Sequence, residues 1–553
     1  MPTTRPPTPT PTPTPTRRGG VLKKLLVAIA VVLILAIALV TVEAFAGAAA
    51  RPTIATDYSR LMHDAALERQ RARLGPGARH PQNRRPAIES MQEDVRAATD
   101  WQLERAHELA EPEQALEHQR EAYYSNPWRY ISLDLVYPVP DEGTAEQFER
   151  ARGHAIDALG EWERRGVFDR SAELVGLGPI ARAPADGPLM EHILPHLGVG
   201  RQLGRAQAAR ARLAAEAGDL QTLYSALEET YVLGRQIAGQ GTLIDWLVGT
   251  ALQALGQAML LDNLLLYPVQ DDAWLARVDA MVRREAVDRF PPLADALAGE
   301  RLFAADFIQR CYTDDGKGGG RFIPLLYAQQ MGQTPEPWTT LTPFGDSKLS
   351  NIHGRLFMDR RAVDAWLDRS HELLGAASTA TGRDALDADE ALARHFVASD
   401  TWRNPATAIR PSYASTLQTD RQRRIQAAGT RVVLAIERHR LRYGDIPASL
   451  DDLGDLLPDP LGTDPFTSQP WDYRPAPVAE MVNGQALLPG ASAWPFTLRS
   501  RPLPGAPNAS HRYDPRHGLL IAEPIQGPEY DQPWGEPWGE PEAEPEREPD
   551  DAP

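Results

Sequence analysis

The chain has a single cysteine, Cys311, among its 553 residues. An intramolecular disulfide is therefore impossible, although an extracytoplasmic compartment would allow one to form. The neighbours Phe307 and Ile308 favour a small half-buried hydrophobe over a reactive thiol, because a cysteine among apolar side chains packs like one. The sequence thus excludes a disulfide framework and gives little support to thiol chemistry.

Positive charge is also scarce. There are 58 Lys and Arg against 75 Asp and Glu, a formal net charge of −17 at pH 7. Residues 1–24 carry +5 and residues 526–553 carry −9, which leaves −13 for residues 25–525. Phosphate contacts require a basic patch, so this acidic body predicts that nucleic acid is not a partner. The hydrophobic content of 42% is still enough for the central part to bury cores.

What the chain does have is a long apolar run near its start. A Pro/Thr-alternating stretch over residues 2–16 and four cations within residues 17–24 precede residues 25–42, which contain no charge. Eighteen helical residues rise about 27 Å, close to the thickness of a bilayer's hydrocarbon core. Because Lys and Arg resist translocation, we expect a cytoplasmic N-terminus, a single-pass cell-membrane protein and a bulk that is extracytoplasmic.

A cleaved signal peptide is the alternative interpretation of this run. The small residues at 44–46 and 48–50 resemble cleavage sites. However, the apolar run is longer than the usual 7–15 residues of a signal peptide. A retained anchor over residues 21–50 is therefore favoured, and the question of cleavage stays open. Residues 1–20 are then a disordered cytoplasmic Pro/Thr tail.

Helical patterns dominate the long middle region, for which we predict an α-helical extracytoplasmic domain over residues 51–418. Glu146 to Arg164 is amphipathic, and residues 201–233 hold two helices separated at Gly218 and Asp219. The apolar stretch 242–266 contains several Asp, Asn and Gln residues. A second membrane span would have to bury these polar groups in lipid at several kcal/mol each, so we predict a core helix instead.

Two glycines of that core helix, Gly249 and Gly256, lie one heptad apart. This spacing places them on the same side of the helix, where the absence of a Cβ atom allows close approach. We therefore expect a neighbouring helix to pack directly against this position.

The pattern changes near residue 419. Residues 420–443 predict a helix with one apolar stripe, and Gly444 follows where a left-handed residue ends helices. Short Pro-rich and aromatic-rich segments then predict turns and strands, so residues 419–525 form a small α+β unit. The acidic, Pro-rich residues 526–553 cannot bury enough surface to fold, and we expect a disordered tail. The stripe consists of Ile425, Ala428, Val432, Ile436, His439 and Tyr443.

Residues 435–453 and 457–474 resemble the major pseudopilin of type II secretion after its long helix. In that family the helix ends in a Gly-x-x-Pro turn, a short Leu-x-x-Leu helix follows, and Asp-Pro-aromatic leads into a strand. The resemblance implies that Leu450 and Leu453 pack back on Val432 and Ile436. It covers under a tenth of the chain, and residues 19–24 lack the glutamate that follows the pseudopilin processing site, so polymerisation is not expected.

The whole arrangement resembles uncharacterised single-pass membrane proteins of planctomycete type. These combine one N-terminal span, an Ala/Leu-rich helical body and a C-terminal Gly-x-x-Pro-x-Ser-Leu-x-x-Leu unit. Residues 241–252 and the later Gly299-Glu300-Arg301 fit that set. The resemblance implies a bacterial envelope location and brings no biochemical activity with it.

Three local patterns invite a chemical interpretation. Ser347 with Asp368 and His371 compares with GDS-type esterases, but no strand precedes the serine. His192 and His196 have helical i,i+4 spacing, which Pro195 disfavours. The loop 313–320 could bind calcium or phosphate, although it lacks the spacing of an EF-hand or a P-loop, and a flexible solvated loop is favoured.

We therefore predict no catalytic, cofactor-binding or metal residues and no cofactor. The expected function is that of a membrane-anchored, envelope-facing structural or interaction protein, with the membrane bound through residues 21–50 and with protein partners. The alternatives are an envelope hydrolase, using Ser347 and His371 or the two histidines, and an accessory component of a type II secretion-like system. Trp534 and Trp538 lie in the acidic segment and could form a short docking motif, although passive disorder is favoured there.

Overall fold

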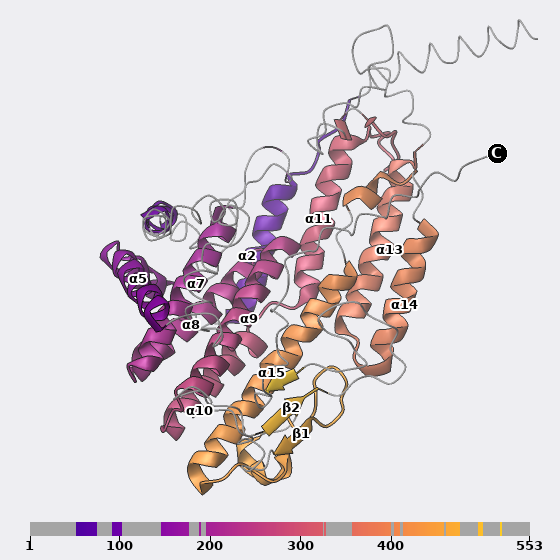
Figure 1. The fold of residues 1–553 in the computed structure, drawn as a ribbon. Coiled ribbons are helices and arrows are strands. Elements are labelled where there is room, and N and C mark those ends of the chain that lie inside the picture. Colours follow the sequence, from indigo (N-terminus) through magenta and orange to yellow (C-terminus); the bar gives the residue numbers. More distant parts are fainter. Residues whose placement is uncertain are drawn as a thin grey trace, which may run out of the picture.

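The computed structural model describes residues 51–74, 91–101, 145–175, 187, 189, 195–324, 326–327, 357–399, 403–409, 413–457, 461–475, 496–500 and 520–522. The predicted cytoplasmic tail 1–20, membrane anchor 21–50 and acidic tail 526–553 lie outside these residues and stay predictions. Within the described part the chain is mainly helical, as predicted (Figure 1).

The elements follow one another as a long series of helices and then a small sheet. The α-helices are α2 (Tyr58–Leu74), α5 (Ala145–Arg164), α6 (Val167–Val175), α7 (Pro195–Glu216), α8 (Leu220–Ala238), α9 (Leu243–Leu266), α10 (Asp272–Val282), α11 (Leu293–Cys311), α13 (Arg360–Thr379), α14 (Gly382–Ser399) and α15 (Tyr413–Tyr443). A π-helix, η3 (Arg283–Asp288), extends α10, and η6 (Pro405–Ile409) and η7 (Leu450–Leu456) are 3-10 helices.

Local signals in the sequence set several helix ends. The amphipathic stretch predicted at 146–164 is α5. Gly218 adopts φ +71 between α7 and α8, and the Asp219 carboxylate accepts the Thr222 N–H at 3.0 Å as the N-cap of α8. The predicted break at these two residues is thus confirmed.

Helix α9 is largely buried, as predicted for a core helix. Among the described residues it is the one helix long and apolar enough to cross a membrane, but it lies mid-chain and 67% of its apolar window is buried inside the protein. A Cβ atom on Gly249 would lie 2.3 Å from the Gly234 carbonyl oxygen, and one on Gly256 would lie 3.0 Å from the Tyr231 ring. The two glycines therefore allow α8 to approach closely, as expected from their spacing.

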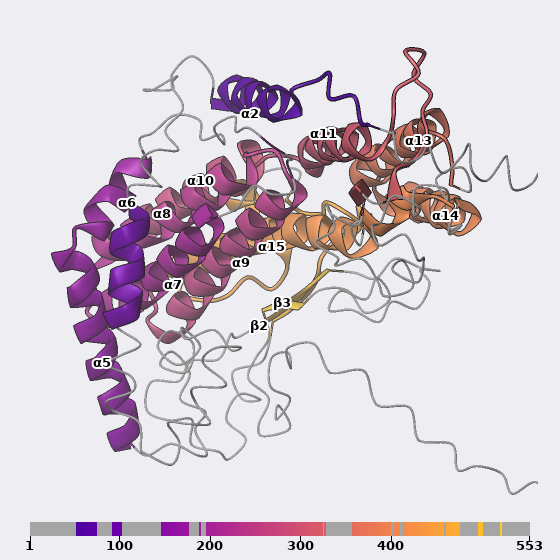
Figure 2. The same ribbon diagram turned by 90° about the horizontal axis from the view of Figure 1, so that it is seen from above.

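Helix α15 runs through the middle of the molecule, with α9 and α10 on one side and α13 and α14 on the other (Figures 1 and 2). It begins at Tyr413, seven residues before the predicted start. The largest core cluster contains Ile425, Val432 and Ile436 of α15 together with residues of α8, α9 and α10. The predicted stripe is buried up to this point, whereas Tyr443 is 68% exposed.

Polar contacts fix the register between α15 and the α10–η3 segment at intervals of seven or eight residues. Asp272 pairs with Arg438 and Arg442, Asp279 pairs with Arg431 at 2.7 Å, and the Ala286 carbonyl accepts from Arg423 at 2.9 Å. The contacting residues are seven apart on α10–η3 and seven and eight apart on α15. Because both spacings are close to two helical turns, the contacts lie along one seam of α15.

The C-terminal segment packs on the same core. Gly444 adopts φ +87 after α15, as predicted, and Leu453 of η7 is buried in the cluster that contains Val432 and Ile436. The strands β1 (Asp472–Pro475), β2 (Phe496–Arg499) and β3 (Leu520–Ala522) form an antiparallel sheet in the order β1-β2-β3. Phe496 of β2 belongs to the same cluster, so sheet and helices share one core.

Candidate functional site

The esterase-like pattern is only partly described. Ser347 lies outside the described residues, so its pairing with His371 stays a hypothesis. The His371 ring nitrogen Nδ1 lies 2.8 Å from the Leu367 carbonyl one turn back, and burial lowers the pKa of this histidine. Asp368 forms an ion pair with Arg301 of α11 at 2.8 Å. Both partners of the expected triad are thus engaged in helix packing.

A serine–histidine contact that the sequence patterns did not reveal lies nearby. The Ser370 hydroxyl is 2.9 Å from His395 Nε2, but it also lies 2.8 Å from the Trp366 carbonyl, to which it donates its single proton. The histidine nitrogen must then donate to the serine oxygen, which is the reverse of what a general base requires. The His395 ring stacks on Trp366 at 5.7 Å, so this pair joins α13 to α14.

The histidine pair of the metal hypothesis is not aligned by a described helix. Pro195 is the first residue of α7, the position at which proline suits a helix because its missing N–H needs no partner there. His192 precedes that helix and lies outside the described residues. Within the described part of the chain, no group of three or more His, Cys, Asp or Glu side chains is arranged to hold a metal ion.

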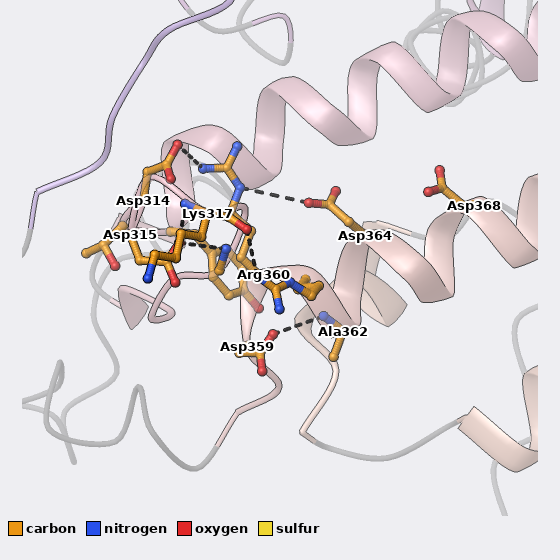
Figure 3. Close-up of polar contacts among 12 residues, drawn as sticks. Asp314, Asp315, Lys317, Asp359, Arg360, Ala362, Asp364 and Asp368 are labelled. Atoms are coloured by element: carbon orange, nitrogen blue, oxygen red, sulfur yellow. Dashed lines mark hydrogen bonds and ion pairs between the residues drawn. The ribbon is translucent and has the colours of Figure 1, made fainter.

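Residues 314–318 of the loop 313–320 are exposed, as expected, but the loop is a hydrogen-bonded hairpin rather than a flexible loop (Figure 3). Thr313 N–H donates to Arg321 O at 3.0 Å, and the Asp315 carboxylate accepts N–H groups of Lys317 and Gly319. These backbone bonds, Lys317 first, hold the pKa of Asp315 below its ordinary value. Turn chemistry of the Asp side chain therefore gives the loop its order.

The hairpin is also docked on the start of α13. Arg360 N–H donates to Gly320 O at 3.1 Å, and the Arg360 guanidinium pairs with Asp314 at 3.1 Å (Figure 3). Arg361 donates to the Lys317 carbonyl at 2.6 Å. Of the two carboxylates that would have to bind calcium, Asp314 thus holds the hairpin to α13 and Asp315 orders the hairpin itself.

The strongest candidate site lies where two segments that are distant in the sequence meet. Residues 241–252 consist of Gly241, the N-cap Thr242 and the start of α9, and Gly299-Glu300-Arg301 lies on α11. A Cβ atom on Gly299 would lie 1.5 Å from the Gly241 carbonyl oxygen, so only glycine fits there. The Glu300 carboxylate accepts the Leu243 N–H at 2.8 Å, and Arg301 pairs with Asp364 and Asp368 of α13.

Helix α2 encloses the same turn from the other side. Gln70 donates to the Gly239 carbonyl, and a Cβ atom on Gly241 would lie 3.6 Å from both Ala66 and Met62. Gln240, in the middle of the turn, is 1% exposed, and neither polar atom of its side-chain amide has a hydrogen-bond partner among the described residues. We call the segment 239–242 with Glu300 the α8–α9 turn site.

Glu300 is the titratable group of this site. Part of its side chain stays exposed, but desolvation of the carboxyl group raises its pKa to about 7, against the opposing effect of the Leu243 N–H and with a further rise from Asp245. Asp245 itself completes a capping box with Thr242 at the start of α9. The site therefore holds a carboxyl group that changes charge near neutral pH.

Buried charged side chains lie next to the turn. Arg235 of α8 contacts Glu285 of η3 at 2.6 Å, and both side chains are less than a tenth exposed. Glu285 also accepts from Arg284, and Asp295 of α11 pairs with Arg73 of α2. Burial, with the neighbouring Arg69 and Arg235, lowers the pKa of Arg73 to about 10. Ion pairs thus join α2 to α11 and α8 to η3.

Comparison with protein-family models, with curated proteins and with solved structures gives no match. The resemblances to the pseudopilin and to the planctomycete-type proteins therefore stay predictions. The sequence gave no signal that Glu300 would reach the first turn of α9, 57 residues away.

We expect replacement of Glu300→Gln to change the pH dependence of stability. The native state holds this proton more tightly than the unfolded chain, so its contribution is present below about pH 4.5 and is lost as pH rises to about 7. Glutamine keeps an acceptor for Leu243 and carries no charge. The variant should be more stable than the parent by roughly 2 kcal/mol at pH 8.

Urea unfolding of both proteins at pH values from 4 to 8 measures this difference. Glu372→Gln is the matched control, because Glu372 is 68% exposed on α13. A parent curve that does not fall between pH 4.5 and 7 relative to Glu300→Gln would contradict the assignment.

Proposed function

We propose that this chain is a single-pass, membrane-anchored structural or interaction protein that faces the bacterial envelope, and that it is not an enzyme. The proposal rests on the structural role of Glu300 and Gly299. The motif that they belong to fastens the α8–α9 turn to α11, with a hydrogen bond of 2.8 Å and a backbone contact that only glycine permits. Its task is to fix the relative positions of helices.

The other groups suited to chemistry support the same proposal. Ser370, His371 and Asp315 each bond to the backbone of their own segment. Cys311 is fully buried, and burial raises the pKa of its thiol to about 12. These contacts stabilise the helices, which supports the proposal of a rigid helical body outside the membrane.

The lone buried cysteine makes the membrane topology directly testable. Val397 is 81% exposed on α14, so Val397→Cys adds one accessible thiol to a protein without another. With a membrane-impermeant maleimide on spheroplasts, we expect this variant to be labelled, whereas Thr8→Cys should react only after lysis. The parent protein is the control and should stay unlabelled under native conditions.

Three outcomes would overturn the proposal. Labelling of Thr8→Cys before lysis would place the N-terminus outside the membrane, and loss of the protein from membranes after a carbonate wash would exclude an integral anchor. For the interaction role, proximity labelling should be done with the labelling enzyme attached outside or inside the membrane. Identical sets of neighbours from the two positions would contradict an envelope-facing role.

A further inference from the structure

The outward side of α9 is apolar although it faces solvent. Ile244 is 53% exposed, Ala251 and Ala258 are exposed, and Leu255 is half-buried. At 100° per residue these side chains lie on the side of the helix away from Gly249, which contacts α8. The other sides of α9 are packed in the core, so its solvent-facing side does not need apolar residues for folding. The exposed apolar stripe therefore indicates a binding surface.

Two cations of α7 flank this stripe. Arg201 and Arg205 are one turn apart, and Gly204 between them lies against Leu252 and Leu255 of α9. Neither guanidinium forms an ion pair within the described part of the chain, and burial, with the neighbouring Arg201, lowers the pKa of Arg205 to about 10. Two like charges at this spacing repel, so a carboxylate brought to them would be favourable.

We call this surface the α7–α9 face; helices α7 and α9 lie side by side there (Figure 2). The small alanines of the stripe leave room for large apolar side chains, which the occupant must offer together with negative charge. The chain itself contains such a segment. Residues 533–540 repeat Pro-Trp-Gly-Glu, and residues 526–553 carry −9. Trp534 and Trp538 would supply apolar area, and Glu536 and Glu540 the charge.

The chain can reach the face. Ala522 of β3 pairs with Leu498 of β2, and Leu498 belongs to the core cluster that includes Met259 and Leu260 of α9. From Ala522 to Trp534 an extended chain spans up to ~40 Å, and α9 itself is about 36 Å long.

We propose that residues 533–541 dock on the α7–α9 face of the same molecule, with the two tryptophans on the stripe of α9 and the glutamates beside Arg201 and Arg205. The segment thereby covers a surface that a partner could otherwise occupy. This proposal does not depend on the membrane anchor or on the role of Glu300.

Disulfide trapping in the full-length protein tests the docking. Ala258→Cys combined with Trp538→Cys should form an intramolecular disulfide under mild oxidation, which is seen as a faster-migrating monomer on a non-reducing gel. Val397→Cys with Trp538→Cys is the matched control, since Val397 is exposed on the distant α14. Changing Arg201→Glu and Arg205→Glu should lower the yield by about fivefold, as expected for the loss of strong exposed ion pairs.

Restoration of the yield by Glu536→Arg and Glu540→Arg in that background would establish the charge pairing. Higher salt should lower the yield of the parent pair, because screening shortens the range of the attraction. Equal yields for the Ala258 and Val397 pairs would overturn the proposal. A dimer band alone would assign the face to a second copy of the chain, and protection of Ala258→Cys from maleimide only by anionic vesicles would assign it to a membrane.

Discussion

Gly249→Ala should destabilise this protein by about 3 kcal/mol, near the upper end for overpacking of a core. The added methyl group would meet the Gly234 carbonyl oxygen at 2.3 Å and the Ala238 backbone nitrogen at 2.6 Å. Because both contacts are with backbone atoms, no rotamer change can relieve them. Helices α8 and α9 would have to move apart along their most extensive contact. Thermal and urea unfolding of parent and variant measure the loss.

Gly153→Ala is the matched control for this substitution. Gly153 lies within α5, and a Cβ atom there would meet nothing within 4 Å. Alanine is the better helix former, so this change should stabilise by roughly 0.5–1 kcal/mol. Opposite signs for the two glycines would attribute the effect to the α8–α9 contact rather than to helix propensity. Equal effects would mean that α8 and α9 do not pack as described.

The sequence predicted those features that depend on neighbouring residues. The break at Gly218 and the helix exit at Gly444 follow from local turn chemistry, and the structure confirms them. The burial of Leu453 is implied by the pseudopilin resemblance, and the structure shows Leu453 in the core cluster. The close approach at Gly249 was predicted from a heptad spacing in one segment. In each case the information lies within a few turns of the residue.

Features that depend on the register between distant segments were not predicted. Helix α15 starts seven residues early because Thr416 and Leu417 are buried against other helices, which local propensity does not report. The seam between Asp279 and Arg431 joins residues 152 positions apart. The loop 313–320 looked flexible because its order comes partly from Arg360 and Arg361 of α13, some forty residues on.

The second large effect on stability is expected from the buried ion pair of Arg235 and Glu285. Both side chains are buried, and Glu285 lies in the π-helix η3, a form that is rare in proteins. Burial alone would raise the pKa of Glu285, but the guanidinium groups of Arg235 and Arg284 outweigh it and lower the pKa. The carboxylate thus depends on its partners to stay charged.

Arg235→Met should therefore cost about 3 kcal/mol at pH 8, the lower end for breaking a buried pair, because Arg284 still contacts Glu285. In the variant, loss of Arg235 should raise the pKa of Glu285 above its unfolded value. A group with a raised pKa stabilises at low pH and loses that contribution as pH rises, so the deficit should shrink toward pH 4.5.

The double variant Arg235→Met/Glu285→Gln should recover much of the loss, since no buried carboxylate then lacks its partner. Arg369→Met is the control, because its pair with Glu372 is exposed on both sides and should be worth under ~1 kcal/mol. Urea unfolding at pH 4.5 and pH 8 measures the free energy of unfolding of the parent, the single variants and the double variant. A deficit of the same size at both pH values would place the energy in packing of the Arg235 stem rather than in the charge that joins α8 to η3.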